Sequence, residues 1–158
     1  MKKLLALVLI LLFSPLSAFA VFPTKSLDLE AGSSQYATIA DASQTGLDIT
    51  GNLTIETWVK IESAPGTYMI AAKWNGGGAQ RSYKWFYNGS GLNFQWTPDN
   101  TSVNAVTVAT DLGTGTWKHV AVVFTAATAT AEFFVDGVSI GSGADTATSI
   151  SKIGRAHV

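Results

Sequence analysis

The chain has 158 residues, which is enough for one domain that buries its own hydrophobic core. It carries 10 Lys and Arg against 11 Asp and Glu, so no strongly basic surface is expected, and nucleic acid and anionic membranes are not expected partners. It contains no Cys, which excludes disulfides and zinc sites built on thiolates.

The first 20 residues have the pattern of a secretory signal peptide. A basic Lys2-Lys3 start precedes an apolar run of ten residues, 4–13, and the small-x-small signal Ala18-Phe19-Ala20 follows. Ten apolar residues are too few for a membrane anchor, which needs about 20, and no second long apolar run follows. We expect cleavage after Ala20, a lead-in over residues 21–25, and secretion or periplasmic export from a bacterium. The exported chain, with eight basic and eleven acidic residues, has a charge of about −3.

Short alternating segments then follow one another along the chain. Residues 26–29 (SLDL) predict a first strand, and residues 35–39 (QYATI) predict a second. In residues 53–61 (LTIETWVKI), Leu53, Ile55, Val59 and Ile61 share one face with Thr57 between them, which predicts a strand with one buried face. Trp58 lies on the opposite, polar face, so this face is expected to be partly covered or to line a groove. Residues 67–73 predict the next strand.

An aromatic hairpin is predicted over residues 83–96. Tyr83, Trp85 and Tyr87 occupy alternate positions, the turn sequence 88–91 (NGSG) follows, and alternation resumes in LNFQW at residues 92–96. Residues 103–109 predict one more strand.

The last predicted strands are the most apolar. Residues 117–124 (WKHVAVVF) are apolar on both faces, as is typical of a central strand. Asp136-Gly137 between the segments 133–135 (FFV) and 138–140 (VSI) is a strong hairpin signal. No segment has a 3.6-residue period over three turns, so we predict an all-β protein with a two-sheet antiparallel sandwich, a jelly roll.

Three segments in series resemble the laminin-G-like domains of the concanavalin A-like lectin/glucanase superfamily. They are SLDLEAGSSQYATIAD, LTIETWVKI, and TWKHVAVVF followed by FFVDGVSIGSG. The resemblance runs from about Ser26 to Gly143. It implies a sandwich that commonly binds glycans or extracellular proteins, often holds calcium at one rim, and is often one module of a larger surface or secreted protein.

The C-terminal segment departs from the pattern of this family. Members continue with a glycine-containing strand and a closing strand, whereas this sequence reaches SKIGRAHV. Ile153 to Val158 matches one translated frame of a widely used sequencing adapter at all six positions. The alternative is that Ile153-Gly154 is genuine, because members often carry Ile-Gly near this point. We expect an incomplete domain over residues 26–152 that lacks its closing strand, with adapter read-through at residues 153–158.

The sequence does not show the catalytic pattern of related hydrolases. Sandwich glucanases place carboxylates at i, i+2 and i+4 on one strand face, as E-x-D-x-E. The residues at i+2 and i+4 from Glu56 are Trp58 and Lys60. From Glu132 they are Phe134 and the turn residue Asp136. We therefore predict a binding module and not an enzyme. The alternatives are a structural or adhesive spacer and, more remotely, a glycoside hydrolase whose catalytic part is missing.

Aromatic and polar side chains near the predicted hairpin are the candidates for ligand binding. Flat rings stack on the apolar faces of sugars, and neighbouring amides and cations bond hydroxyl groups. The candidates are Trp74, Arg81, Trp85, Tyr87, Asn93, Gln95 and Trp96. The alternative is that these aromatic residues fill the core of the sandwich.

Oxygen-bearing loop residues are the candidates for calcium, the one cofactor that the resemblance implies, because calcium prefers carboxylate, amide and carbonyl oxygens. These candidates are Asp28, Asn75, Asp99, Asn100 and Asp111. No D-x-[DN]-x-[DN]-G loop is present, and the alternative is that all five are turn residues.

Overall fold

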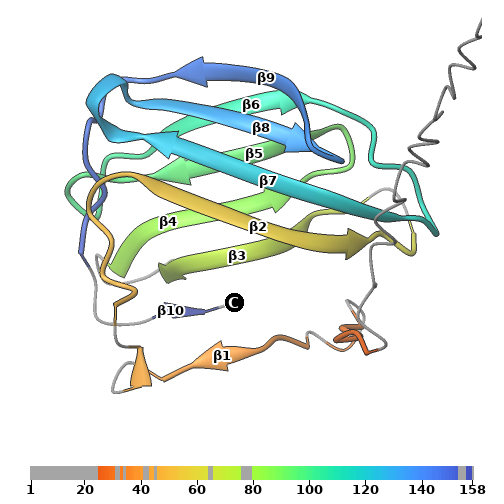
Figure 1. Cartoon of the computed structure of the whole chain (residues 1–158). Helices are drawn as coiled ribbons and strands as arrows, with labels where there is room; N and C mark the ends of the chain where they lie inside the picture. The colour runs from red at the N-terminus through yellow and green to blue at the C-terminus, as the bar shows by residue number, and fades with distance from the viewer. Residues whose placement is uncertain are drawn as a thin grey trace, which may run out of the picture.

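Two antiparallel sheets stack face to face (Figure 1). The computed structural model describes residues 25–30, 33, 35–40, 43–44, 46–63, 66–75, 80–152 and 156–157. The six-stranded sheet has the order β1-β10-β3-β4-β5-β6, and the four-stranded sheet has the order β2-β7-β8-β9. The strands are β1 (Thr38–Ile39), β2 (Leu53–Lys60), β3 (Tyr68–Asn75), β4 (Gln80–Tyr87), β5 (Gly91–Trp96), β6 (Asn104–Ala109), β7 (Trp117–Thr125), β8 (Thr130–Val135), β9 (Val138–Ala144) and β10 (Ala156–His157). The predicted all-β, two-sheet antiparallel jelly roll is confirmed.

The strands with the clearest alternation form where the sequence predicts them. Along β2, Leu53 is buried and packs into the core with Ile55 and Val59, while Glu56 and Trp58 are exposed. β7 pairs with β2 on one side and with β8 on the other, which confirms it as a central strand. Its apolar residues on both faces therefore serve the core on one side and the outer face of the sheet on the other.

Both predicted hairpins are present, and turn residues explain their geometry. Asp136 and Gly137 have φ angles of 51° and 79°, as the turn between β8 and β9 requires. Between β4 and β5, the Asn88 side chain accepts hydrogen bonds from the backbone N–H groups of Ser90 and Gly91. These local contacts set the register of each hairpin.

The first two predicted strands are only partly correct. Residues 26–29 form no strand, and the second is reduced to β1, Thr38–Ile39. Leu27 is 68% exposed and Leu29 is 45% exposed, so neither side of this alternating segment is buried against the sandwich. Alternation predicts a strand only where a neighbouring strand and an apolar layer are available to cover one face.

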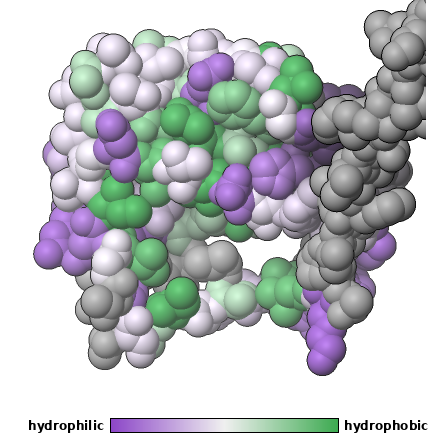
Figure 2. Space-filling model, in the orientation of Figure 1, coloured by the Kyte–Doolittle hydropathy of each residue, from purple (hydrophilic) through white to green (hydrophobic). Residues whose placement is uncertain are grey.

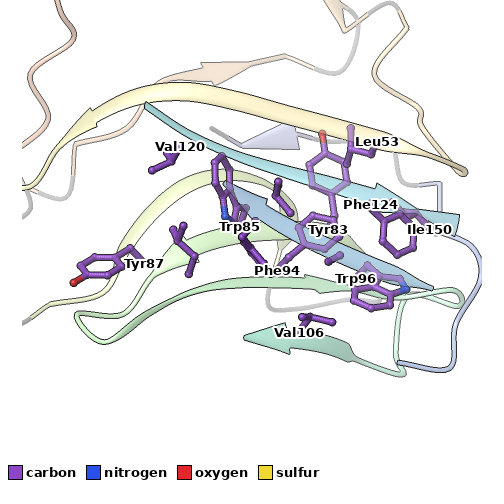
Figure 3. Packing of buried hydrophobic residues seen from close by; sticks show 14 of the residues in the cluster. Leu53, Tyr83, Trp85, Tyr87, Phe94, Trp96, Val106, Val120, Phe124 and Ile150 are labelled. Carbon is purple, nitrogen blue, oxygen red and sulfur yellow. The ribbon is translucent and has the colours of Figure 1, made fainter. Parts of the chain in front are cut away.

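The core lies between the sheets and is rich in aromatic residues (Figure 3). Trp85, Phe94 and Trp96 from the six-stranded sheet are fully buried. The Trp96 ring centroid lies 4.8 Å from that of Phe124, which belongs to β7 of the other sheet, so this contact joins the two layers. Burial of each such side chain contributes roughly 1.5–3 kcal/mol.

The short strand β10 lies within residues 153–158, the segment predicted to be adapter read-through. It pairs with β1 and with β3, through His157 opposite Thr38 and Ala72. This pairing places β10 beside β3 at one side of the six-stranded sheet. The origin of the segment and the incompleteness of the domain stay predictions.

The outer face of the four-stranded sheet is turned toward the viewer in Figure 1. Figure 2 shows apolar side chains gathered at its middle, with hydrophilic groups around them. Ala121, Val123 and Phe134 belong to this face, because they alternate with buried core residues of β7 and β8. In the part of the chain that the structure describes, no helix has the length and apolar character needed to cross a bilayer.

Candidate functional site

Two aromatic rings and two cations lie together on the outer face of the six-stranded sheet. On β4, Lys84 and Phe86 alternate with buried core residues, so they point away from the other sheet. The Lys84 Nζ lies 4.8 Å from the centroid of the Trp74 ring and 5.3 Å from that of Phe86. The Arg81 guanidinium carbon lies 5.7 Å from the Trp74 centroid. We call Trp74, Arg81, Lys84 and Phe86 the outer cluster, and all four are half-buried.

The local strand geometry brings this cluster together. β3 and β4 are antiparallel neighbours, and a register shift between Lys73 and Trp74 sets Trp74 opposite Arg81. Lys73 points into the protein and is 1% exposed, so the adjacent Trp74 lies on the other side of the strand. The irregularity therefore places the Trp74 ring within reach of both cations.

The electrostatic environment of the outer cluster is positive. The strands of the six-stranded sheet contain no Asp or Glu. Within the described part of the chain, Lys84 makes no ion pair with a carboxylate. Removal from water and, secondly, the positive charge of Arg81 lower the pKa of Lys84. The two aromatic faces offset part of this cost through cation–π contacts.

A row of polar side chains continues from the outer cluster onto β5 and β6. Gln95 lies opposite Lys84, and Asn93 lies opposite Phe86. Asn93 is already engaged: its Oδ1 accepts a hydrogen bond from Thr107 Oγ1 at 2.5 Å, and its Nδ2 donates to the Gly91 carbonyl at 3.1 Å. Among the described residues, the amide of Gln95 has no hydrogen-bond partner. It is half-buried and offers both a donor and an acceptor to a ligand.

The structure brings together some of the predicted ligand-binding residues and separates others. Trp74, Arg81 and Gln95 lie on the outer face, around Lys84. Trp85, Tyr87 and Trp96 are at most 2% exposed and lie in the core, so a ligand role for these three is wrong. The reason is that the face of the hairpin with more aromatic residues fills the space between the sheets. Asn93 lies on the outer face, but it is buried and hydrogen-bonded, so it supports the surface rather than offering a free amide.

Two members of the outer cluster were missed by the sequence analysis. Lys84 and Phe86 alternate with Tyr83, Trp85 and Tyr87 along β4. The signal that could have found them is this second alternating set, because a strand with apolar residues on one face presents the other set to the outside.

The predicted calcium ligands mostly serve turns. The Asp99 carboxylate accepts hydrogen bonds from the backbone N–H groups of Thr101 and Ser102 and from the Ser102 hydroxyl. These bonds hold the pKa of Asp99 well below its ordinary value of 3.8. Asp111 accepts the Gly113 N–H in a similar turn.

The two candidate asparagines also have structural contacts. Asn75 donates to Gln80 Oε1 at 3.4 Å. Asn100 has a φ angle of 68° and hydrogen-bonds the Ser151 hydroxyl. Calcium binding by any of these turn residues stays a prediction.

Asp28 is the one predicted calcium ligand that gathers with other carboxylates. One carboxylate oxygen from each of Asp28, Glu30 and Glu62 lies within 4.8 Å of the other two. Two ligands on opposite sides of one calcium ion are about 4.8 Å apart, so the spacing fits one ion. All three side chains are exposed, and the partners Glu30 and Glu62 were not predicted from the sequence.

A cleft of about 720 Å³ lies between the segment 25–30 and strands β2 and β3. Its lining includes Trp58 and Trp117, which confirms that the polar face of β2 lines a groove at Trp58. One wall of this cleft is a segment that forms no strand and whose side chains are exposed. The outer cluster is built entirely on paired strands, so it is the better preorganised of the two surfaces.

Several solved structures share this fold. The carbohydrate-binding module CBM40 of the Ruminococcus gnavus IT-sialidase, bound to α2,3-sialyllactose, aligns with a TM-score of 0.57 and 14% identity over 78% of this chain and 76% of that chain. Domains LG4-5 of the mouse laminin α1 chain align with a TM-score of 0.55 and 16% identity over 87% of this chain and 39% of that chain. A heptameric SAP-like pentraxin from Limulus polyphemus aligns at 0.51 and 15% identity over 70% of this chain, which spans only 52% of that chain. At these identities, the likeness shows the fold alone.

No curated protein sequence matches this chain. A family model, Laminin_G_3, described as the concanavalin A-like lectin/glucanases superfamily, matches residues 31–157. This match covers most of the chain and agrees with the predicted resemblance. The chain therefore belongs to the Laminin_G_3 family of the concanavalin A-like lectin/glucanases superfamily.

Proposed function

We propose that this chain is an exported, non-catalytic domain that binds carbohydrate through the outer cluster. The observation that carries the proposal is the pair of half-buried rings, Trp74 and Phe86, which flank Lys84 on the outer face of the six-stranded sheet. Such rings stack on the C–H faces of sugars, and the nearby Gln95 amide can bond hydroxyl groups. One of the structural neighbours supports this proposal, because it is a carbohydrate-binding module bound to sialyllactose.

The chemistry of the face supports binding without catalysis. Glycoside hydrolysis requires two carboxyl groups flanking the sugar bond. The strands that carry the outer cluster and the polar row have no Asp or Glu. A sugar bound flat on this face would meet rings, amides and cations but no carboxyl pair from these strands.

The alternative of a structural spacer is less well supported. Three of the predicted aromatic residues are in the core, as a spacer would require, but Trp74 and Phe86 are not. Half-buried rings beside an available amide are unnecessary in a spacer and useful in a binding surface.

Trp74→Ala is expected to weaken glycan binding by about tenfold or more, because truncation of a Trp hot spot costs about 2 kcal/mol or more and about 1.4 kcal/mol corresponds to tenfold. Binding of the full chain is measured on a glycan array and then by titration calorimetry with the strongest hit. Circular dichroism checks that the sheets are intact.

Trp58→Ala is the matched control, because Trp58 is 39% exposed on the other sheet. It is expected to bind glycan as the wild type does. Loss of binding in Trp58→Ala with retention in Trp74→Ala would place the site in the cleft and contradict the proposal, as would the absence of any glycan hit.

Export is expected to remove residues 1–20. A reporter fused after Lys25 should leave the cytoplasm of a bacterial host, and N-terminal sequencing of the exported product should begin at Val21. A product that retains Met1 and stays in the cell would contradict an export signal.

A further inference from the structure

The outer cluster holds two like charges beside one aromatic ring. Arg81 and Lys84 both contact Trp74, at 5.7 Å and 4.8 Å from its centroid. Lys84 is partly removed from water, and its ammonium has no carboxylate within ion-pair distance among the described residues. The partial loss of hydration and the nearby positive charge of Arg81 both destabilise the Lys84 ammonium when no anion lies beside it.

The third cation of strands β3 and β4, Lys73, has a carboxylate partner, unlike Lys84. Lys73 points into the protein, where its Nζ contacts Asp48 Oδ1 at 2.5 Å and the Leu47 carbonyl at 3.2 Å. Its charge is therefore neutralised inside the fold. The outward-facing Lys84 receives two aromatic rings instead of a carboxylate, although the whole chain has one more acidic than basic residue.

The placement of carboxylates elsewhere strengthens this contrast. Glu56 and Glu132 lie on strands of the four-stranded sheet, and the Asp28, Glu30 and Glu62 cluster borders the cleft. Asp145 reaches the six-stranded sheet at its β6 edge, where it accepts the Ala105 N–H at 3.0 Å. β5 separates that edge from β4, which carries the two cations.

We propose that the outer cluster selects acidic glycans: a carboxylate or sulfate of the ligand lies against Lys84 and Arg81, and the sugar ring that carries it stacks on Trp74. This inference rests on the proposed function and names its ligand class. The ligand anion supplies the negative charge that Lys84 lacks, and the Gln95 amide opposite Lys84 bonds a neighbouring hydroxyl group. An aromatic wall makes the cations more effective, because it excludes water from one side of the charge.

The test compares three probes that share one neutral core: lactose, 3′-sialyllactose and 3′-sulfolactose. The full chain is expected to bind at least one acidic probe about tenfold or more tightly than lactose, as expected for one charge-assisted hydrogen bond. The two acidic probes distinguish a carboxylate ligand from a sulfate ligand. Raising the salt concentration should reduce the difference in affinity between the acidic probes and lactose, because salt screens part of the attraction between the ligand anion and the cations.

Substitutions then show which side chain causes the preference for the acidic probes over lactose. Lys84→Met keeps the side-chain stem between the two rings and removes the charge, so it is expected to bind the acidic probe no better than lactose. Lys84→Arg is expected to retain most of the preference. Lys60→Met, on the other sheet, changes the net charge by the same amount and is the matched control, which should behave as the wild type.

A wild-type readout keeps the test independent of how well the variants fold. Binding of the acidic probe should raise the pKa of Lys84, followed by NMR of its side chain, because a nearby anion favours the charged ammonium. Equal affinity for lactose and both acidic probes, an unchanged Lys84 pKa on binding, or a preference that survives in Lys84→Met would overturn acidic selectivity. If Trp74→Ala still weakens binding in those cases, the proposed glycan function stands. No binding to any glycan overturns both.

Discussion

Trp96→Ala is expected to destabilise the folded chain by about 3–5 kcal/mol, the cost of removing a large aromatic side chain from a packed core. Trp96 is fully buried, and its ring lies 5.7 Å from Phe94 and 4.8 Å from Phe124. Its Nε1 also donates to the Ala147 carbonyl at 2.8 Å, which ties the segment after β9 to the six-stranded sheet. Truncation removes a contact between the layers, leaves a cavity and deprives a carbonyl of its donor.

Urea unfolding followed by tryptophan fluorescence and circular dichroism measures this loss. The sharper comparison uses Phe in place of each buried Trp. Trp96→Phe loses the bond to Ala147, whereas Trp85 Nε1 has no hydrogen-bond partner among the described residues. Trp96→Phe should therefore be the more destabilising of the two, because it alone leaves a carbonyl without its donor. Equal stabilities would show that the Ala147 bond contributes little to the stability of the fold.

Local patterns predicted most of the strands, because a period of two has a direct physical cause. Where one face of a strand is buried, apolar residues recur at alternate positions, as in β2 and in both strands of the aromatic hairpin. Asp136-Gly137 predicted its own turn, since both residues adopt the positive φ angles that this turn needs. The family resemblance follows from the same segments and agrees with the match over residues 31–157.

The candidate site was harder to predict, because alternation shows which residues share a face but not which face lies inside. On β4, one set contains Tyr83, Trp85 and Tyr87, and the other contains Lys84 and Phe86. Both sets contain aromatic residues, so either could have formed a ligand platform. The structure resolves this by burying the larger set in the core, which leaves Lys84 and Phe86 on the outside.

Contacts between segments that are far apart in the sequence explain the other differences between the predicted and the observed structure. Residues 26–29 alternate, but strand formation depends on a partner that lies far away in the sequence. Asp28, Glu30 and Glu62 meet because an extended segment runs beside the end of β2, and no local motif records that arrangement.

Asp48→Asn is expected to lower the melting temperature at pH 7 through the buried cation that it neutralises. Lys73 is 1% exposed, and its Nζ contacts Asp48 Oδ1 at 2.5 Å. Lys152 contacts the other carboxylate oxygen of Asp48 at 3.1 Å. Removing the carboxylate leaves the Lys73 ammonium buried without its counter-ion, which costs more than the loss of a surface pair.

The pH dependence of this contribution follows from the pKa of Asp48. Hydrogen bonds from Lys73 and then Lys152 lower that pKa from its ordinary value of 3.8. A carboxyl whose pKa is lower in the folded state adds stability that is fully present above its unfolded pKa and is lost as the pH falls through the folded pKa. The melting temperature of the wild type should therefore fall below about pH 4. The difference in melting temperature between the wild type and Asp48→Asn should become smaller over the same pH range.

Lys73→Met separates the role of the pair from the role of the buried cation. It removes the charge that needs Asp48 and replaces it with an apolar side chain of similar length, a change that is often neutral or stabilising for a buried pair. It should melt at or above the wild-type temperature at pH 7. Asp136→Asn, which breaks the more exposed pair with Lys118, should have a small effect. If Lys73→Met were as unstable as Asp48→Asn, the ion pair itself would be stabilising the sandwich. If instead Lys73→Met melts at or above the wild-type temperature and Asp48→Asn melts below it, Asp48 is needed because it neutralises the buried Lys73.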